Sequence, residues 1–315
     1  KNFLRKIIYQ RFYQPILDKK VSYPKKKFFF INKGTLNPDK IFYVIQRYPG
    51  FGLFSNLAFV LNHIKIAKSL GFVPIVDMQN FPTIYNEKNK IFNTLNSWEY
   101  YFDQLSNFSL EEVYKSKNVI LTDNRFYSDD LDFFSNITDS KDLIDILNND
   151  IKLKKNKINL IKSVKKKLFQ DKKILGVHFR GTTYKTAGVV YAIAPNQMIN
   201  KINEILSKEK YDKIFLVTED LGNFNSIINY FGDKVVFLKT SKRGKSDLDV
   251  WDNYSRNRHR YKLGRDILVE TYLLSFCDGF IDIETNPRAI AHGLNLNPNQ
   301  KRYTIDNGHN KSWPI

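Results

Sequence analysis

Apolar residues in the first part of the chain switch between short continuous runs and helical spacing. The first run, residues 41–46, is long enough for a buried strand, and a turn containing glycine follows it. Over residues 56–70 apolar side chains recur at helical spacing, and Gly71 stands where a helix would end. Residues 72–77 form a second strand-like run. Strand, turn, helix and strand in this order form one βαβ unit, which predicts a parallel sheet.

A second alternating series fills the C-terminal half of the chain. Its expected strands are residues 174–179, 213–217, 235–238 and 279–283, and its expected helices are residues 195–206, 221–231, 261–276 and 287–294. Between the two series we expect a strand at 119–122, a helix at 141–147 and a long lysine-rich connecting helix at 151–169, whereas residues 1–40 are interpreted as basic and irregular. The pattern predicts an α/β fold of two Rossmann-like domains, residues 1–165 and 166–315, that face each other across a cleft.

The composition agrees with two folded domains. A length of 315 residues fits two domains of about 150 residues each. Hydrophobic residues at 42% and aromatic residues at 15% are enough to build cores, which excludes a disordered chain and a small stapled module. No apolar run reaches the roughly 18 residues that cross a bilayer. Cys277 is the single cysteine, which excludes an internal disulfide and a cysteine-based zinc site.

The net charge of +18 is the strongest signal in the composition. It has three interpretations: a lysine-coated surface, an anionic partner, or nucleic acid. The anionic partner could be a nucleotide-sugar, an acidic polysaccharide or a membrane surface. No helix-turn-helix, zinc-finger or RNA-recognition signature is present, which argues against nucleic acid.

The most informative polar residues follow the strand at 174–179. Ligands of parallel α/β sheets bind at the carboxyl ends of the strands. His178 and Arg180 share a face there, because side chains alternate along a strand. The planar fork of Arg180 suits a diphosphate, Gly181 permits close approach of the backbone, and the hydroxyl of Thr182 adds a donor. The alternative is a surface arginine beside a core histidine.

Other strand ends and one helix carry further candidates. Glu219 follows the strand at 213–217, either as part of a polar site or as an acid near a helix start. Thr285 and Asn286 precede a helix, where a hydroxyl and unpaired N–H groups could hold an anion or simply cap the helix. Glu270 lies on the largely apolar helix 261–276. A buried carboxylate needs a partner, either the amide edge of a purine or a nearby basic side chain.

Two charged segments are more ambiguous. Arg256, Arg258, Arg260 and Arg265 form either a solvated basic loop or a flap that closes over an anionic ligand. Residues 247–249, an acid-x-acid triplet, are similar to the metal motif of some glycosyltransferases, although no strand precedes them.

Several segments, in order, resemble the fucosyltransferase superfamily that includes nodulation-type α1,6-fucosyltransferases and protein O-fucosyltransferases. Residues 178–183 are similar to its His-x-Arg-Gly-Thr-Asp motif. Further similar segments are residues 50–57 for its early glycine-rich loop, 218–220 for its Thr-Asp-Asp/Glu segment, 264–278 for its late helix and 285–286 for its Ser/Thr-x pair. The resemblance spans roughly residues 41–295.

The resemblance implies a GT-B fold, a GDP-sugar donor substrate, inversion at the anomeric carbon, and neither a metal nor another cofactor. Arg180 would hold the β-phosphate, His178 would lie near the guanine or ribose, and Glu270 would pair with guanine. Gly181 and Thr182 belong to the same motif. The resemblance further implies phosphate contacts at Thr285 and Asn286, and cleft positions in the first domain for Gly52 and Asn56.

One departure leaves the catalytic base and the donor sugar open. Thr183 stands where the family usually has Asp, and residues 185–188 lack the glutamate that some relatives place there. Asp77, at the end of a first-domain strand, and Glu219 are the two candidate bases. The sugar could be fucose, a heptose or another 6-deoxy sugar.

The sequence therefore predicts an inverting, metal-independent glycosyltransferase that moves a sugar from GDP to a hydroxyl of a surface glycan such as capsule or O-antigen. Its acceptor would be a glycan or a lipid-linked glycan. We expect a cytoplasmic location, with peripheral binding to the inner face of the membrane as a variant. Two alternatives remain: a transferase of another activated anionic group on the same fold, and an inactive module that binds polysaccharide or nucleic acid.

Overall fold

The computed structural model describes residues 19–23, 26–31, 34–47, 52–122, 137–182, 191–251 and 256–308. The chain divides into two compact units, Lys1–Lys152 and Leu153–Ile315. The division lies ahead of helix α5 (Lys155–Phe169), whereas we expected the first domain to end within this helix, at residue 165. Ile161 and Phe169 of this helix pack into a core cluster of the second unit, which explains the difference. In the described part of the chain, no helix is long and apolar enough to span a membrane.

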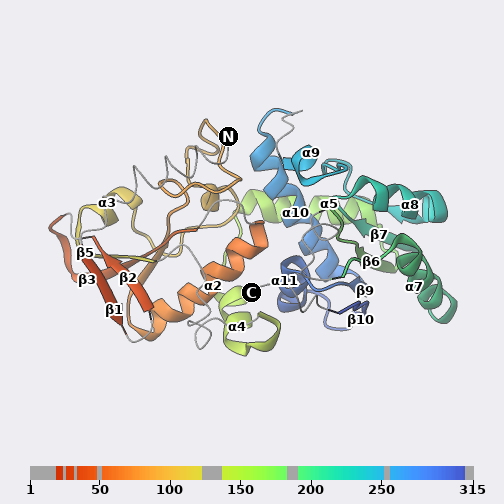
Figure 1. Ribbon diagram of the computed structural model, residues 1–315, viewed down its shortest axis with the longest axis horizontal. Helices are drawn as coiled ribbons and strands as arrows, with labels where there is room; N and C mark the ends of the chain where they lie inside the picture. Colours follow the sequence, from red (N-terminus) through yellow and green to blue (C-terminus); the bar gives the residue numbers. More distant parts are fainter. Residues whose placement is uncertain are drawn as a thin grey trace. The chain divides into compact units, whose positions relative to one another are not determined.

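The first unit contains a mixed five-stranded sheet in the order β1-β2-β5-β3-β4 (Figure 1). Its strands are β1 (Lys19–Tyr23), β2 (Lys26–Phe30), β3 (Leu36–Ile45), β4 (Val73–Val76) and β5 (Ser116–Thr122). Strand β3 runs parallel to both β4 and β5, whereas β2 is antiparallel to β1 and β5. The expectation of irregular structure is therefore wrong for the described residues 19–23, 26–31 and 34–40: β1 and β2 pair antiparallel and extend the sheet beyond β5.

Helix α2 (Leu53–Ser69) connects β3 to β4 and completes the predicted βαβ unit. The helix ends as expected at a glycine, because Gly71 has a φ of +68°, which favours a residue without a Cβ. The other helices among the described residues of this unit are α3 (Leu110–Tyr114) and α4 (Lys141–Asn149), with 3₁₀ turns η2 (Ser97–Tyr100) and η4 (Ile137–Asp139).

The second unit contains a fully parallel sheet in the order β10-β9-β6-β7-β8 (Figure 1). Its strands are β6 (Ile174–His178), β7 (Lys213–Val217), β8 (Val235–Val236), β9 (Gly279–Asp282) and β10 (Lys301–Thr304). The chain adds β7 and β8 on one side of β6, then returns to add β9 and β10 on the other side. The strand order therefore reverses between β6 and β9, and such a switch point opens a crevice for ligands at the carboxyl ends.

Helices cover both faces of this sheet, as its apolar strands require. Within the described residues, α7 (Pro195–Lys208) and α8 (Leu221–Phe231) pack in one core, and α5, α10 (His259–Phe276) and α11 (Asn286–Leu294) pack in the other. The short helix α9 (Asp247–Trp251) and the 3₁₀ turn η5 (Gly232–Lys234) also belong to this unit. Alternate strand residues serve separate cores. Leu175 of β6 packs in a cluster with Ile202 of α7, whereas Ile174 packs in another with Leu273 of α10.

Gly279, at the start of β9, generates a stability prediction. A Cβ at this position would lie 2.4 Å from the hydroxyl oxygen of Tyr211. That hydroxyl is 3.1 Å from the hydroxyl of Tyr303, so the ring is held in place. We expect Gly279→Ala to lower the free energy of unfolding by about 1–3 kcal/mol, the usual cost of overpacking a core. Urea denaturation followed by circular dichroism measures it.

The matched control removes the Tyr211 side chain, which a Cβ at residue 279 would contact. In a Tyr211→Ala background, Gly279→Ala should cost clearly less than in the wild type, because the two sites are coupled through one contact. Equal denaturation midpoints for Gly279→Ala and the wild type would show that the strand shifts at no cost.

Candidate functional site

The switch point of the second unit brings His178 and Thr285 into contact. His178 ends β6 and is buried, and its Nδ1 lies 3.2 Å from Oγ1 of Thr285. Thr285 also caps α11, because its Oγ1 accepts a hydrogen bond from the backbone N–H of Arg288 at 3.2 Å. Burial, together with the nearby charge of Arg180, lowers the pKa of His178 to about 3. The imidazole is therefore neutral at physiological pH.

Glu219 lies directly against the loop that follows β6. Its Oε1 is 3.2 Å from Nη1 of Arg180 and accepts hydrogen bonds from the backbone N–H of Gly181 and the hydroxyl of Thr182, both at 3.0 Å. The side chains of Arg180 and Glu219 are 26% and 16% exposed. A single carboxylate thus fixes three consecutive residues that the sequence assigned to the site.

Asp220 completes this arrangement and was not predicted as a site residue. Its Oδ2 accepts a hydrogen bond from the N–H of Thr182 at 3.1 Å, and its Oδ1 caps α8 through the N–H of Asn223 at 2.8 Å. A Cβ on residue 181 would lie 2.3 Å from the Cβ of Asp220, so only glycine fits there. Thr182 has a φ of +38°, which this hydrogen-bonded contact maintains.

Glu270 is buried on α10 beside the loop that follows β8. Its Oε1 accepts a hydrogen bond from the hydroxyl of Ser241 at 2.5 Å. Burial raises the pKa of Glu270 to about 8, and the charges of Asp266 and Glu219 act in the same direction. The charge of Arg243 acts in the opposite direction. Among the described residues, no hydrogen bond reaches the Oε2 atom.

Arg243 is the basic neighbour of Glu270 that sequence reasoning missed. Its guanidinium lies 4.2 Å from the ring centre of Phe224 and 5.1 Å from that of Phe237. Nη1 donates to the backbone oxygen of Ser241 at 3.2 Å, while Nε and Nη2 are buried and find no hydrogen-bond partner in the described part of the chain. No motif surrounds Arg243, so no signal in the sequence could have found it.

Two of the four arginines proposed for a flap are paired with Asp266 on α10. Nη1 of Arg256 lies 2.9 Å from Oδ2 of Asp266, and Nη2 of Arg265 lies 2.5 Å from its Oδ1. These two side chains are therefore anchored, which argues against their part in a flap. Residues 252–255 of the segment lie outside the described residues.

The acid-x-acid triplet at 247–249 opens the short helix α9. The carboxylate of Asp249 accepts a hydrogen bond from the N–H of Lys245 at 3.0 Å, so it stabilises a turn. Within the described ranges, no group of three or more metal-ligating side chains comes together.

In the first unit, Asp77 is fully buried and strongly hydrogen-bonded. Its Oδ1 accepts from the N–H groups of Gln79 and Asn80, and its Oδ2 accepts from the Asn80 amide at 2.8 Å and the Tyr114 hydroxyl at 2.6 Å. Burial, followed by the charge of Asp77, raises the pKa of Tyr114. These contacts favour a role in holding the loop after β4.

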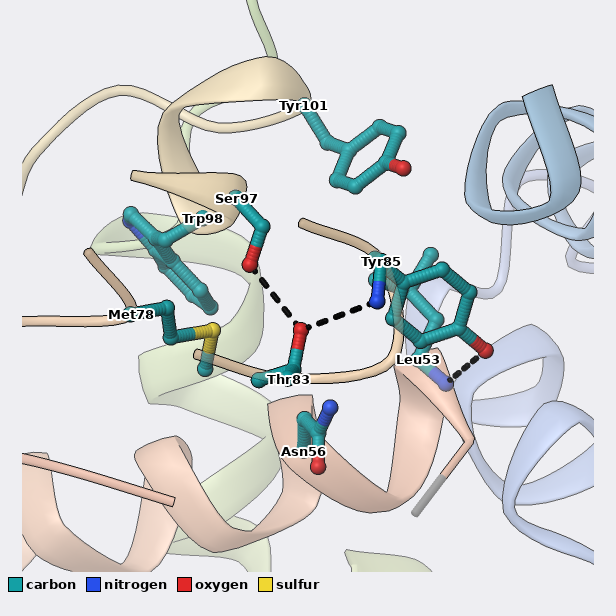
Figure 2. Close-up of a pocket in the computed structure, with 8 residues that line it drawn as sticks. All are labelled: Leu53, Asn56, Met78, Thr83, Tyr85, Ser97, Trp98 and Tyr101. Atoms are coloured by element: carbon teal, nitrogen blue, oxygen red, sulfur yellow. Dashed lines mark hydrogen bonds between the residues drawn. The ribbon is translucent and has the colours of Figure 1, made fainter. Parts of the chain in front are cut away.

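Gly52 is the N-cap of α2, and Asn56 in the first turns of this helix lines a small aromatic pocket (Figure 2). The pocket is lined by Leu53, Asn56, Met78, Thr83, Tyr85, Ser97, Trp98 and Tyr101. Asn56 accepts a hydrogen bond at Oδ1 from Nε of the buried Arg47 at 3.3 Å. Burial lowers the pKa of Arg47 to about 10, and its guanidinium lies 4.3 Å from the ring centre of Phe59. Arg47 was not among the predicted site residues.

Asn286, the first residue of α11, is exposed beside Thr285. The structure therefore brings Arg180, Gly181, Thr182 and Glu219 together. It also places His178, at the end of β6, in contact with Thr285, which follows the neighbouring strand β9. Glu270 lies on α10, and the charge of Glu219 contributes to its pKa. Asp77, Gly52 and Asn56 belong to the first unit.

No protein-family model and no curated protein sequence matches the chain. Among solved structures, NodZ α1,6-fucosyltransferase co-crystallised with GDP is similar, with a TM-score of 0.52, 16% identity, and coverage of 82% of this chain and 92% of that one. The same enzyme soaked with GDP-fucose has a TM-score of 0.51 and 15% identity, with coverage of 81% of this chain and 93% of that one. Fucosyltransferase NodZ from Bradyrhizobium has a TM-score of 0.50 and 15% identity, with coverage of 81% of this chain and 92% of that one. The chain thus has the α/β, GT-B-like fold of these fucosyltransferases, as the sequence predicted.

Proposed function

We propose that this protein is an inverting glycosyltransferase and that its second unit binds a GDP-sugar donor. The observation that carries the proposal is the arrangement at the switch point, where Arg180 and Thr285 stand at the ends of adjacent parallel strands. The fold of NodZ, which was crystallised with GDP and soaked with GDP-fucose, supports it.

Arg180 is proposed to stabilise the leaving diphosphate. The negative charge of that group grows as the bond to the anomeric carbon breaks, and a fixed guanidinium is a strong partner for it. Glu219 holds Arg180 at 3.2 Å, so the positive charge is positioned before the donor binds. Thr285 and the first N–H groups of α11 are proposed to add phosphate contacts.

Glu270 is proposed to select guanine. An ionised carboxylate accepts two hydrogen bonds, and the N1–H and 2-amino groups of guanine supply two adjacent donors. Ser241 already donates to Oε1, which fixes the orientation of the carboxylate. Adenine lacks this pair of adjacent donors, so it would leave the buried Glu270 poorly satisfied.

The catalytic base remains a prediction shared by Glu219 and Asp77. The side chain of Glu219 is 16% exposed, whereas Asp77 is fully buried and accepts four hydrogen bonds. An acceptor hydroxyl can therefore reach Glu219 more readily. The contacts of Glu219 oppose this role, because its Oε1 already binds Arg180, the N–H of Gly181 and the hydroxyl of Thr182.

The finer assignments are also part of the proposal. The donor sugar would be fucose, a heptose or another 6-deoxy sugar, and the acceptor a hydroxyl of a surface glycan such as capsule or O-antigen. The net charge of +18 supports an anionic donor and peripheral binding to the inner face of the membrane. A cleft between the two units, lined by Gly52 and Asn56, stays a prediction.

Replacing Arg180 tests its role in catalysis. We expect Arg180→Ala to lower kcat by about 10²–10³, or about 2.7–4 kcal/mol, by analogy with the loss of an oxyanion-hole donor. Arg180→Lys should restore little, because an ammonium lacks the planar fork. Steady-state transfer from GDP-fucose measures the loss, and thermal melting confirms folding. Near wild-type turnover in a folded Arg180→Ala protein would contradict the role.

Ionisation of Glu270 should control nucleotide binding. The pKa of about 8 means that much of the unliganded protein carries a protonated Glu270 at pH 7. Because guanine needs the carboxylate, GDP affinity should rise about fivefold from pH 7 to pH 8, by about twofold more above pH 8, and then level off. Glu270→Gln should bind GDP at least about tenfold more weakly and lose the pH dependence. Calorimetric titration measures both; identical pH profiles for the two proteins would contradict the assignment.

Transfer should not depend on a divalent metal. Arginines and helix N-termini can stabilise the leaving diphosphate in place of a cation. We therefore expect unchanged rates after EDTA treatment, measured as GDP release from GDP-fucose. Loss of activity with EDTA and its recovery with Mn²⁺ would revive residues 247–249 as a metal site.

A further inference from the structure

A pocket of the second unit is lined by two arginines, Arg180 and Arg288, which come from different parts of the chain. Arg180 follows β6, whereas Arg288 belongs to the first turn of α11, which follows β9. Strands β6 and β9 are hydrogen-bonded neighbours, so both arginines come from the switch point. Three isoleucines, at positions 193, 283 and 305, supply apolar lining. Nothing in the sequence patterns pointed to Arg288.

Asp282 positions the side chain of Arg288. This aspartate ends β9 and is fully buried. Its Oδ1 lies 3.6 Å from Nε of Arg288, and its Oδ2 lies 2.9 Å from Nε2 of His292. A buried carboxylate in ion-pair distance of a guanidinium restricts where that guanidinium points. Asp282 therefore positions the guanidinium of Arg288, as Glu219 positions that of Arg180.

The terminal nitrogens of Arg288 have no hydrogen-bond partner among the described residues. The side chain of Arg288 is 24% exposed. Within the described residues, its one polar contact is the contact with Asp282. Nε is buried and also lacks a hydrogen bond, because 3.6 Å from Oδ1 of Asp282 is too long for one. A mostly buried cation with unused donors at a pocket wall calls for an anion with several oxygens.

The acidic residues of the pocket do not oppose this ligand strongly. Glu284 and Asp306 also line the pocket, but both are exposed, so solvent and salt screen their charges. The carboxylate of Asp306 also accepts a hydrogen bond from the N–H of Gly308 at 2.7 Å. Carboxylates at the rim suit the hydroxyl groups of a sugar that continues from the phosphate.

We propose that Arg288 is a second diphosphate-binding residue, which holds the terminal, sugar-bearing phosphate of the donor together with Arg180. The inference rests on the proposed function, since it adds a residue to the same site. Two guanidinium forks on one phosphate match its oxygens better than one, and they share the charge that develops on the leaving group.

Calorimetric titration of the full chain with GDP, GMP and inorganic pyrophosphate tests the proposal. Arg288→Ala should weaken binding of GDP and pyrophosphate by about tenfold or more, because each loses a charge-assisted contact. Binding of GMP, which lacks the terminal phosphate, should change less than about twofold. Arg288→Lys should recover part of the affinity. Arg302→Ala, the same charge change at an exposed position of β10, is the matched control and should bind all three ligands normally.

Each outcome decides between explanations. Wild-type affinity of Arg288→Ala for both GDP and pyrophosphate overturns the inference and leaves the proposed function standing. Equal weakening of GMP and GDP, with a lowered melting temperature, assigns Arg288 a structural role and also overturns the inference. A wild-type protein that binds none of the three ligands overturns the proposed function together with it.

Discussion

The site depends on one set of contacts, in which the carboxylates of Glu219 and Asp220 hold the loop that follows β6. Glu219 receives the guanidinium of Arg180, the N–H of Gly181 and the hydroxyl of Thr182, and Asp220 receives the N–H of Thr182. Without these acceptors the buried N–H groups would lack partners and the positive φ of Thr182 would be unsupported. The parallel pairing of β6 with β7 makes the contact, because it brings the ends of both strands together.

The same physical constraint, a buried charge that needs a fixed partner, recurs around the switch point. Asp282 lies between Arg288 and His292, and Asp266 lies between Arg256 and Arg265. Removing one member of such a group leaves the other buried and unpaired, which is more costly than losing the pair as a whole. These carboxylates therefore fix the orientation of arginines at the carboxyl end of the sheet before any ligand arrives.

Much of this fold could be predicted from the sequence, because its strands and helices have strong local patterns. The bounds of β7 and α8 agree with the predicted residues 213–217 and 221–231, and those of β6 and α11 agree to within one residue. The hairpin of β1 and β2 was missed, because its pairing with β5 joins residues far apart in the chain. The exposed strand β10 carries too few apolar residues to be recognised.

The candidate site was predictable where chemistry follows directly after a strand, as at His178, Arg180 and Glu219. Arg243 could not be found, since it acquires its meaning from Glu270, which is distant in sequence. Arg288 could not be found either, since no motif marks its contact with the nearby Asp282, which depends on how the chain turns after β9. Asp77 illustrates the converse case. A carboxylate at a strand end looks catalytic in sequence, but local N–H groups and the hydroxyl of Tyr114 occupy both its oxygens.

We propose that the second unit recognises a guanine nucleotide through both its diphosphate and its base. Titration of the wild-type protein with GDP, UDP, ADP and CMP at one pH and one salt concentration tests it most directly. GDP should bind at least about tenfold more tightly than the other three, which is the contribution of one hydrogen-bonded carboxylate. Equal affinity for all four nucleotides, or binding that follows phosphate number and salt alone, would contradict it.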